Sequence, residues 1–206
     1  VKDGMILGRE LPGVNGVVLL KKGAVICSSY IDKLKELGYI GVYIEDDLSS
    51  DIEVSDVISQ TIRLKTVKTV KSTFIAVQNG KRISEDCINS LQSLMNDIAE
   101  SLLSNKDVMI NLIDLKVFDD YTYYHSVNVG ILAITLGATL NLSKKKLYKL
   151  GLAAVLHDIG KVFISKSILN KPGKLTSEEF DIVKTHSQIG YEYLKKADLP
   201  LTSCKA

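Results

Sequence analysis

Residues 143–161 read SKKKLYKLGLAAVLHDIGK, and this stretch decides the fold of the second half of the chain. Apolar residues recur in it at helical spacing, which is typical of an amphipathic helix. On one face of that helix His157 follows Leu147, Leu150 and Ala154. Gly160 then stops the pattern. The stretch therefore predicts a helix over residues 143–157 that carries a histidine–aspartate pair, His157 and Asp158, at its C-terminal end.

Helical periodicity extends to both sides of this stretch. Further helices are predicted from residue 55 to the Asn79-Gly80 pair, from a cap at Ser84 onward, over 119–140 and over 177–196. The helix after Ser84 carries one apolar stripe, made of Ile88, Leu91, Met95, Ile98 and Leu102. The last of these begins with Thr176 and Glu179, whose spacing is that of a capping box. The chain beyond residue 55 is therefore predicted to be helical.

The beginning of the chain has a different pattern. Short strands are expected at residues 5–7 and 17–20, with the hairpin signal Asn15-Gly16 between them. A helix over 28–37 and a strand over 39–44 follow. The fold class is therefore mainly α, a helical domain preceded by a small N-terminal α+β module. We divide the chain into residues 1–54 for this module, 55–104 for connecting helices and 105–206 for the helical domain.

Composition excludes several classes of protein. The chain of 206 residues has 26 basic and 24 acidic side chains, and its longest like-charge block is residues 144–146, which argues against a surface for polymeric nucleic acid. The most apolar stretch, residues 127–140, is too short and too interrupted for a membrane span. Cys27, Cys87 and Cys204 form no paired motif, so a reducing, cytoplasmic setting is expected.

The chain has only three histidines, and each falls in a different predicted helix. The helical phase of His125, His157 and His186 predicts that all three point inward, with His125 on one stripe with Val129, Leu132 and Leu136. Imidazoles that converge from facing helices, with Asp158 as a bridging carboxylate, form a site suited to Fe, Mn, Zn or Ni. The alternative is three hydrogen-bonded core histidines. It would require partners for six ring nitrogens in an apolar interior, which is costly.

Four blocks in order along the chain carry a family resemblance: YTYYHSV at 121–127, LHDIGK at 156–161, ILNKPGKLT at 168–176 and HSQIGY at 186–191. Together they resemble the HD-GYP family, a branch of the HD-domain metal-dependent phosphohydrolases, over about residues 119–199. Residues 4–56 resemble, more loosely, the small module that precedes the HD-GYP domain in some bacterial proteins.

The resemblance implies a bacterial phosphodiesterase that hydrolyses cyclic di-GMP to a linear dinucleotide or to GMP at a centre of two or three metal ions. His125, His157, Asp158 and His186 match metal ligands, with Asp158 as the bridge. Lys161 matches the family lysine that contacts the scissile phosphate, so Lys161 and Asp158 are the implied catalytic residues. Without the motif, Lys161 would be read as a solvated lysine at a helix end.

Two departures from the family pattern affect this interpretation. Tyr121 stands where three-metal members carry a glutamate ligand, which favours two ions, Fe or Mn, although Asp119 and Asp120 lie near enough to leave the number open. The sequence also ends at Ala206, before the family's adjacent histidines, its Gly-Tyr-Pro loop and its last aspartate ligand. We therefore expect a C-terminally truncated fragment or a degenerate protein, inactive or weak in this form.

Two other functions remain open at this stage. One is a non-catalytic signalling or interaction module with a degenerate HD core, and the other is a general HD phosphohydrolase acting on mononucleotides. The block at 168–176 favours the HD-GYP interpretation, with a cyclic dinucleotide as substrate. A homodimer is neither required nor excluded by the sequence.

Overall fold

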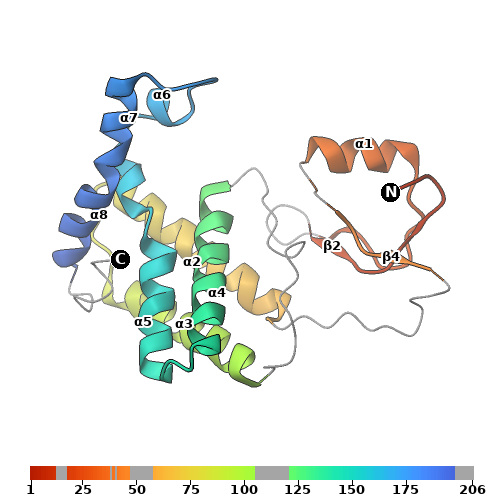
Figure 1. Ribbon diagram of the computed structural model, residues 1–206, viewed down its shortest axis with the longest axis horizontal. Helices are drawn as coiled ribbons and strands as arrows, with labels where there is room; N and C mark the ends of the chain where they lie inside the picture. The colour runs from red at the N-terminus through yellow and green to blue at the C-terminus, as the bar shows by residue number, and fades with distance from the viewer. Residues whose placement is uncertain (13–17, 38, 40, 47–57, 105–120, 198–206) are drawn as a thin grey trace.

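The structure, a computed structural model, describes residues 1–12, 18–37, 39, 41–46, 58–104 and 121–197. Most of them are helical, which confirms the mainly α fold (Figure 1). After the N-terminal module the elements are α2 Gln60–Gln78, α3 Glu85–Ser104, α4 Tyr121–Thr139, α5 Lys144–Leu156, the 3₁₀ helix η3 Ile159–Phe163, α6 Lys166–Leu169, α7 Ser177–Lys184 and α8 His186–Lys195.

Helices α2 to α5 share one core. The apolar stripe predicted for α3 is buried along its length, and α5 lies against both α3 and α4, so its residues from Gly151 to Leu156 are enclosed. The largest fully buried side chains of this core are Phe74, Leu91, Met95, Ile98, Ile131, Ile134, Leu147, Leu152, Leu156 and Ile159. Burial of this apolar surface is the main stabilising contribution to the bundle.

The orientation of α4 differs from the prediction. The sequence placed His125 on an inward stripe with Leu132 and Leu136, but these two leucines are 43% and 62% exposed. The face that packs on α5 and α2 instead carries Ile131 and Ile134, which are fully buried. Because α4 is apolar on nearly all sides, periodicity alone could not decide which face meets the core.

The predicted helix over residues 177–196 is in fact two helices, α7 and α8, with a break at Thr185. The break has a local cause. The Thr185 hydroxyl donates to the carbonyl of Ile182 at 2.6 Å, and the imidazole of His186 lies 2.6 Å from the carbonyl of Val183. These side chains occupy carbonyls that a continuous helix would offer to backbone N–H groups.

The capping box predicted at the start of α7 is confirmed. The Glu179 amide donates to the Thr176 hydroxyl at 3.2 Å, and the Thr176 amide donates to the Glu179 carboxylate at 2.8 Å. We expect Thr176→Ala to lower the free energy of unfolding by about 1 kcal/mol. Urea denaturation followed by circular dichroism measures this, with Ser177→Ala as the matched control. Equal losses in the two variants would contradict the cap's contribution.

The N-terminal module consists of β1 Ile6–Leu7, β2 Leu11–Pro12, β3 Val18–Leu20, α1 Ser28–Glu36 and β4 Ile44–Glu45. Its pairing differs from the expectation, because β3 pairs with β2, a strand not predicted, and β1 pairs with β4. The hairpin signal at Asn15-Gly16 lies outside the described residues. The module buries Leu7, Leu11, Ile26 and Leu34 in its own small core.

The module also contacts the helical bundle, next to which it lies in Figure 1. Tyr39 packs against both hydrophobic cores. Burial, together with the nearby Tyr124 of α4, raises the pKa of Tyr39 well above its usual range, so its hydroxyl stays protonated. A core this small is close to the limit for independent stability, which accounts for the docking.

Candidate metal centre

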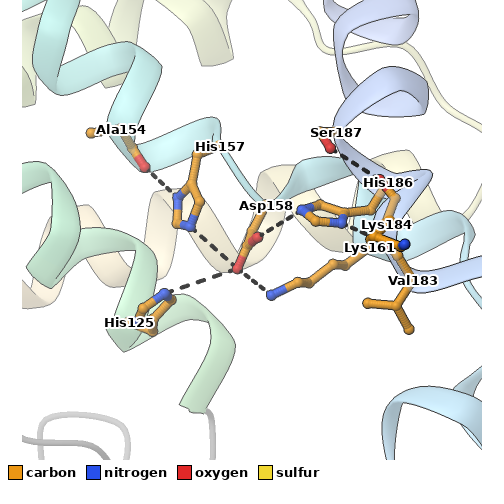
Figure 2. Close-up of polar contacts among 9 residues, drawn as sticks. All are labelled: His125, Ala154, His157, Asp158, Lys161, Val183, Lys184, His186 and Ser187. Atoms are coloured by element: carbon orange, nitrogen blue, oxygen red, sulfur yellow. Dashed lines mark hydrogen bonds and ion pairs between the residues drawn. The ribbon is translucent and has the colours of Figure 1, made fainter. Parts of the chain in front are cut away.

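All four predicted metal residues meet at one place in the structure (Figure 2). His125 comes from the first turn of α4, His157 and Asp158 follow the C-terminal end of α5, and His186 is the first residue of α8. Lys161 reaches the same place from η3. Residues more than 60 positions apart in the chain are therefore brought together around the Asp158 carboxylate.

Asp158 lies at the centre of this cluster and is almost completely buried, with its side chain 4% exposed. Its Oδ2 atom lies 3.4 Å from His157 Nε2, 4.0 Å from His125 Nε2 and 2.7 Å from the Lys161 ammonium. Its Oδ1 atom lies 3.5 Å from His186 Nε2. The two oxygens of one carboxylate thus face different imidazoles.

The imidazoles are less enclosed than the sequence predicted. The side chains of His125, His157 and His186 are 34%, 29% and 22% exposed, so they line an accessible site above the buried Asp158 rather than the interior of the core. The reason is their position at helix ends, where side chains reach the edge of the bundle. An exchangeable ligand can therefore enter the site from solvent.

Hydrogen bonds fix the orientation of two rings. His157 Nδ1 lies 2.7 Å from the Ala154 carbonyl, and His186 Nδ1 lies 2.6 Å from the Val183 carbonyl. A carbonyl can only accept, so each Nδ1 carries a proton, and this contact turns the Nε2 atom of each ring toward the Asp158 carboxylate. A metal-binding histidine is typically held by this type of backbone contact.

The resulting arrangement favours a cation. The Nε2 atoms of His157 and His186 face the two oxygens of a buried carboxylate, and a cation between them would bind ring nitrogens and carboxylate oxygens together. The candidate ligand atoms of His125, His157 and Asp158 lie within 4.8 Å of one another. Since metal–ligand bonds of this kind are about 2.0–2.2 Å long, sub-ångström side-chain shifts would allow one ion to contact all three. The donor set therefore fits a divalent metal.

Burial also favours the metal-binding form of one ligand. Desolvation lowers the pKa of His125 below its usual value, and the charges of His157 and Lys161 act in the same direction, while Asp158 opposes them. His125 is therefore neutral at pH 7. Neutral imidazole is the form that binds metal.

Gly160 was predicted only as the end of a helix, but it also places His186 in the site. An alanine Cβ at Gly160 would lie 1.8 Å from the backbone oxygen of His186 and 2.8 Å from the Gly190 nitrogen. Only glycine permits this approach of α8 to η3. The sequence contains no signal for this contact, because residues 160 and 186 belong to separate helices.

Two predicted features are not described by the structure. Asp119 and Asp120, the alternative ligands near the start of α4, lie outside the described residues, and so does Cys204. The two other cysteines, Cys27 and Cys87, are free thiols. Among the described residues no helix is long and apolar enough to cross a membrane.

Comparison with known proteins identifies similar sequences and a similar fold. Residues 122–206 match the family model of the HD domain. The chain is 45% identical over 101 residues, 49% of its length, to cyclic di-GMP phosphodiesterase PA4108 of Pseudomonas aeruginosa. It is 25% identical over 196 residues, 93% of its length, to the cyclic di-GMP phosphodiesterase response regulator RpfG of Xanthomonas campestris.

A solved structure shares the fold. Bd1817, an HDG"Y"P protein from Bdellovibrio bacteriovorus, superposes with a TM-score of 0.61 at 18% identity, over 99% of this chain and 71% of that one. The aligned regions cover 24% of the length of the Pseudomonas protein and 51% of that of the Xanthomonas protein. The similarity thus extends over the N-terminal module and the helical domain, but over only part of these relatives.

Proposed function

From the HD domain at residues 122–206, which bears out the resemblance to HD-GYP proteins, we propose that this chain carries part of the active site of a metal-dependent phosphodiesterase that hydrolyses cyclic di-GMP. The main supporting observation is that the Nε2 atoms of His157 and His186 face the two oxygens of the buried Asp158, at 3.4 and 3.5 Å. The names of the similar proteins supply the substrate class.

In the proposed site His125, His157, His186 and the shared carboxylate of Asp158 would hold two divalent ions, Fe or Mn. Imidazole and carboxylate together suit these metals better than Ca or Mg. When bound, such ions neutralise charge on the phosphoryl oxygens and lower the pKa of a bound water.

Two side chains of this chain, Asp158 and Lys161, have further roles in the proposed reaction. Asp158 fixes the spacing of the site because it is buried and cannot rotate freely. Lys161, 2.7 Å from Asp158 Oδ2, is a charged donor at the edge of the site and would contact a nonbridging oxygen of the scissile phosphate. A positioned ammonium at this point stabilises the extra negative charge that develops as the phosphodiester is attacked.

We expect the proposed activity to depend on metal and on the length of chain tested. Four ligands among the described residues hold two ions weakly, and a misplacement of about 1 Å at a reacting centre can cost on the order of a hundredfold in rate. Residues 1–206 are therefore expected to hydrolyse cyclic di-GMP negligibly, and the longest version that the gene encodes should hydrolyse it in the presence of Mn or Fe.

The test incubates both versions with cyclic di-GMP, with added Mn or Fe and with a chelator, and follows linear dinucleotide and GMP by chromatography. Rapid turnover by residues 1–206 would contradict the ligand count. A longer version that binds metal but hydrolyses neither cyclic di-GMP nor a mononucleotide would favour the alternative, a non-catalytic signalling module.

The proposal includes three further points. A cytoplasmic location is supported by the free thiols of Cys27 and Cys87. The domain limits at residues 54 and 104 stay part of the proposal, and the second is supported by the end of α3 at Ser104. A homodimer is supported by the exposed leucines of α4, and sedimentation of a Leu136→Lys variant beside the parent chain tests it.

A further inference from the structure

A cavity of about 610 Å³ adjoins the metal centre, and Lys161 borders both. Its walls come from α2, the first turn of α4, η3, α6 and the segment that leads into α7. A volume of this size is typical of pockets that bind small organic ligands. The metal centre accounts for the phosphate end of a substrate and leaves this cavity without an assigned role.

The walls of the cavity combine apolar and polar side chains. The apolar and aromatic side chains that line it include Phe74, Tyr123, Ile164, Ile168, Leu175 and Val183. Phe74 is buried and holds the Tyr123 ring edge to face, with ring centroids 5.7 Å apart and planes at 85°. Tyr123 therefore presents an aromatic ring, held by Phe74 of the core, as part of the cavity wall.

The wall opposite α2 is held by an ion pair. The Lys171 ammonium donates to both oxygens of Glu179, at 2.8 and 2.6 Å, and Glu179 also accepts from the Thr176 amide. This pair closes the turn through Gly173, whose φ of +100° only glycine adopts readily. The charge of Lys171 is therefore neutralised by Glu179, and this ion pair holds the wall of the cavity in place.

Polar side chains of the cavity can form hydrogen bonds with a ligand. The amides of Gln78 and Asn170 each offer a donor and an acceptor. Lys166 borders the cavity at an exposed position, and the described residues that line the cavity include no carboxylate. Such a cavity suits a flat, uncharged heterocycle that is attached to an anionic group.

We propose that this cavity holds one nucleobase of the substrate, with the attached phosphate directed past Lys161 to Asp158. The inference rests on the proposed function and adds the residues that recognise the base. The base stacks on Tyr123 and contacts Ile168, and the amides of Gln78 and Asn170 bond to its edge. Base–aromatic stacking is a strong and sequence-tolerant contact, and amide hydrogen bonds add selectivity.

The test measures binding rather than turnover. Residues 1–206 with Mn²⁺ are titrated in a calorimeter with GMP and with ribose 5-phosphate, which has the same sugar phosphate but no base. GMP should bind at least tenfold more tightly. Equal affinities would overturn the base pocket and leave the proposed function intact. If neither GMP nor ribose 5-phosphate binds, the base pocket and the proposed function are both overturned, because the phosphate then has no binding site.

Three variants locate the base. Ile168→Trp fills the cavity and should reduce GMP affinity about tenfold without changing the affinity for ribose 5-phosphate. Tyr123→Leu removes the stacking ring and should likewise reduce GMP affinity without changing the affinity for ribose 5-phosphate. Val25→Trp, on the surface of the N-terminal module, is the control and should bind as the parent chain does. Circular dichroism verifies that each variant folds.

The affinities of the cavity variants for GMP and ribose 5-phosphate decide whether the base binds in this cavity. Loss of GMP affinity in either cavity variant, with ribose 5-phosphate unaffected, supports the assignment even if the other variant fails to fold. GMP affinity that is unchanged in a folded Ile168→Trp chain would place the base elsewhere and overturn the inference.

Discussion

Asp158→Asn should abolish metal binding by this chain. The substitution keeps the shape of the side chain and removes the negative charge that His125, His157 and His186 surround. Since the carboxylate is buried and supplies an oxygen to each side of the site, no other carboxylate among the described residues of the cluster can replace it. We expect the Mn or Fe content of protein purified without chelator to fall at least tenfold, because the amide is a much poorer ligand for these ions.

Elemental analysis measures this, and Asp181→Asn is the matched control. Asp181 is an exposed aspartate of α7 that pairs with Lys184, so its loss should leave metal content unchanged. A normal circular dichroism spectrum for Asp158→Asn would separate loss of the site from loss of the fold. Equal metal content in the parent chain and Asp158→Asn would contradict the proposed centre.

Gly160→Ala is expected to destabilise the fold by about 3 kcal/mol, at the upper end of the usual cost of overpacking. The added methyl group would overlap the backbone oxygen of His186, and backbone atoms cannot rotate away as a flexible side chain can. Relief of the overlap requires α8 to move away from η3, which also withdraws His186 from Asp158. Metal content should therefore fall together with stability.

Urea denaturation gives the free energy of unfolding, and Gly190→Ala provides a graded control on the opposite side of the same contact. A Cβ at Gly190 would lie 3.2 Å from its nearest neighbour, the Gly160 nitrogen, which requires a shift of only a few tenths of an ångström. Gly190→Ala should therefore cost clearly less. If Gly160→Ala were as stable as Gly190→Ala and kept its metal, the close approach of α8 would not hold His186.

The two substitutions test different parts of one site. Asp158→Asn removes a ligand and leaves the backbone in place, whereas Gly160→Ala leaves every ligand and changes where one of them lies. Loss of metal in both variants would indicate that the centre needs its ligands and also the contact between η3 and α8. Loss in Asp158→Asn alone would indicate that His186 is dispensable and that His125 and His157 suffice.

Much of the helical domain could be predicted from the sequence, because short-range patterns encode helix ends and buried stripes. The stripe of α3, the stop at Asn79-Gly80 and the capping box at Thr176 are confirmed. At Gly80 the φ of +72° explains why glycine follows the last turn of α2. These features depend on residues within a few positions of one another, which periodicity and capping rules describe.

Predictions failed where two segments compete for one face or one partner. The periodicity of α4 did not identify its buried side, since apolar residues surround the helix and α5 selects among them. The strand pairing of the N-terminal module was also missed, because strands of two or three residues carry little pattern of their own. The break at Thr185 depends on side-chain hydrogen bonds that spacing does not report.

By itself the sequence determined the helical class of this protein and the residue types of its metal site. Three histidines and an aspartate at helix ends are chemically suited to a divalent ion wherever they meet. Only the tertiary structure decided that His125 and His157 face one oxygen of Asp158 while His186 faces the other. That division depends on contacts between helices distant in the chain, above all α8 against Gly160, and such contacts follow from packing in three dimensions rather than from spacing along the sequence.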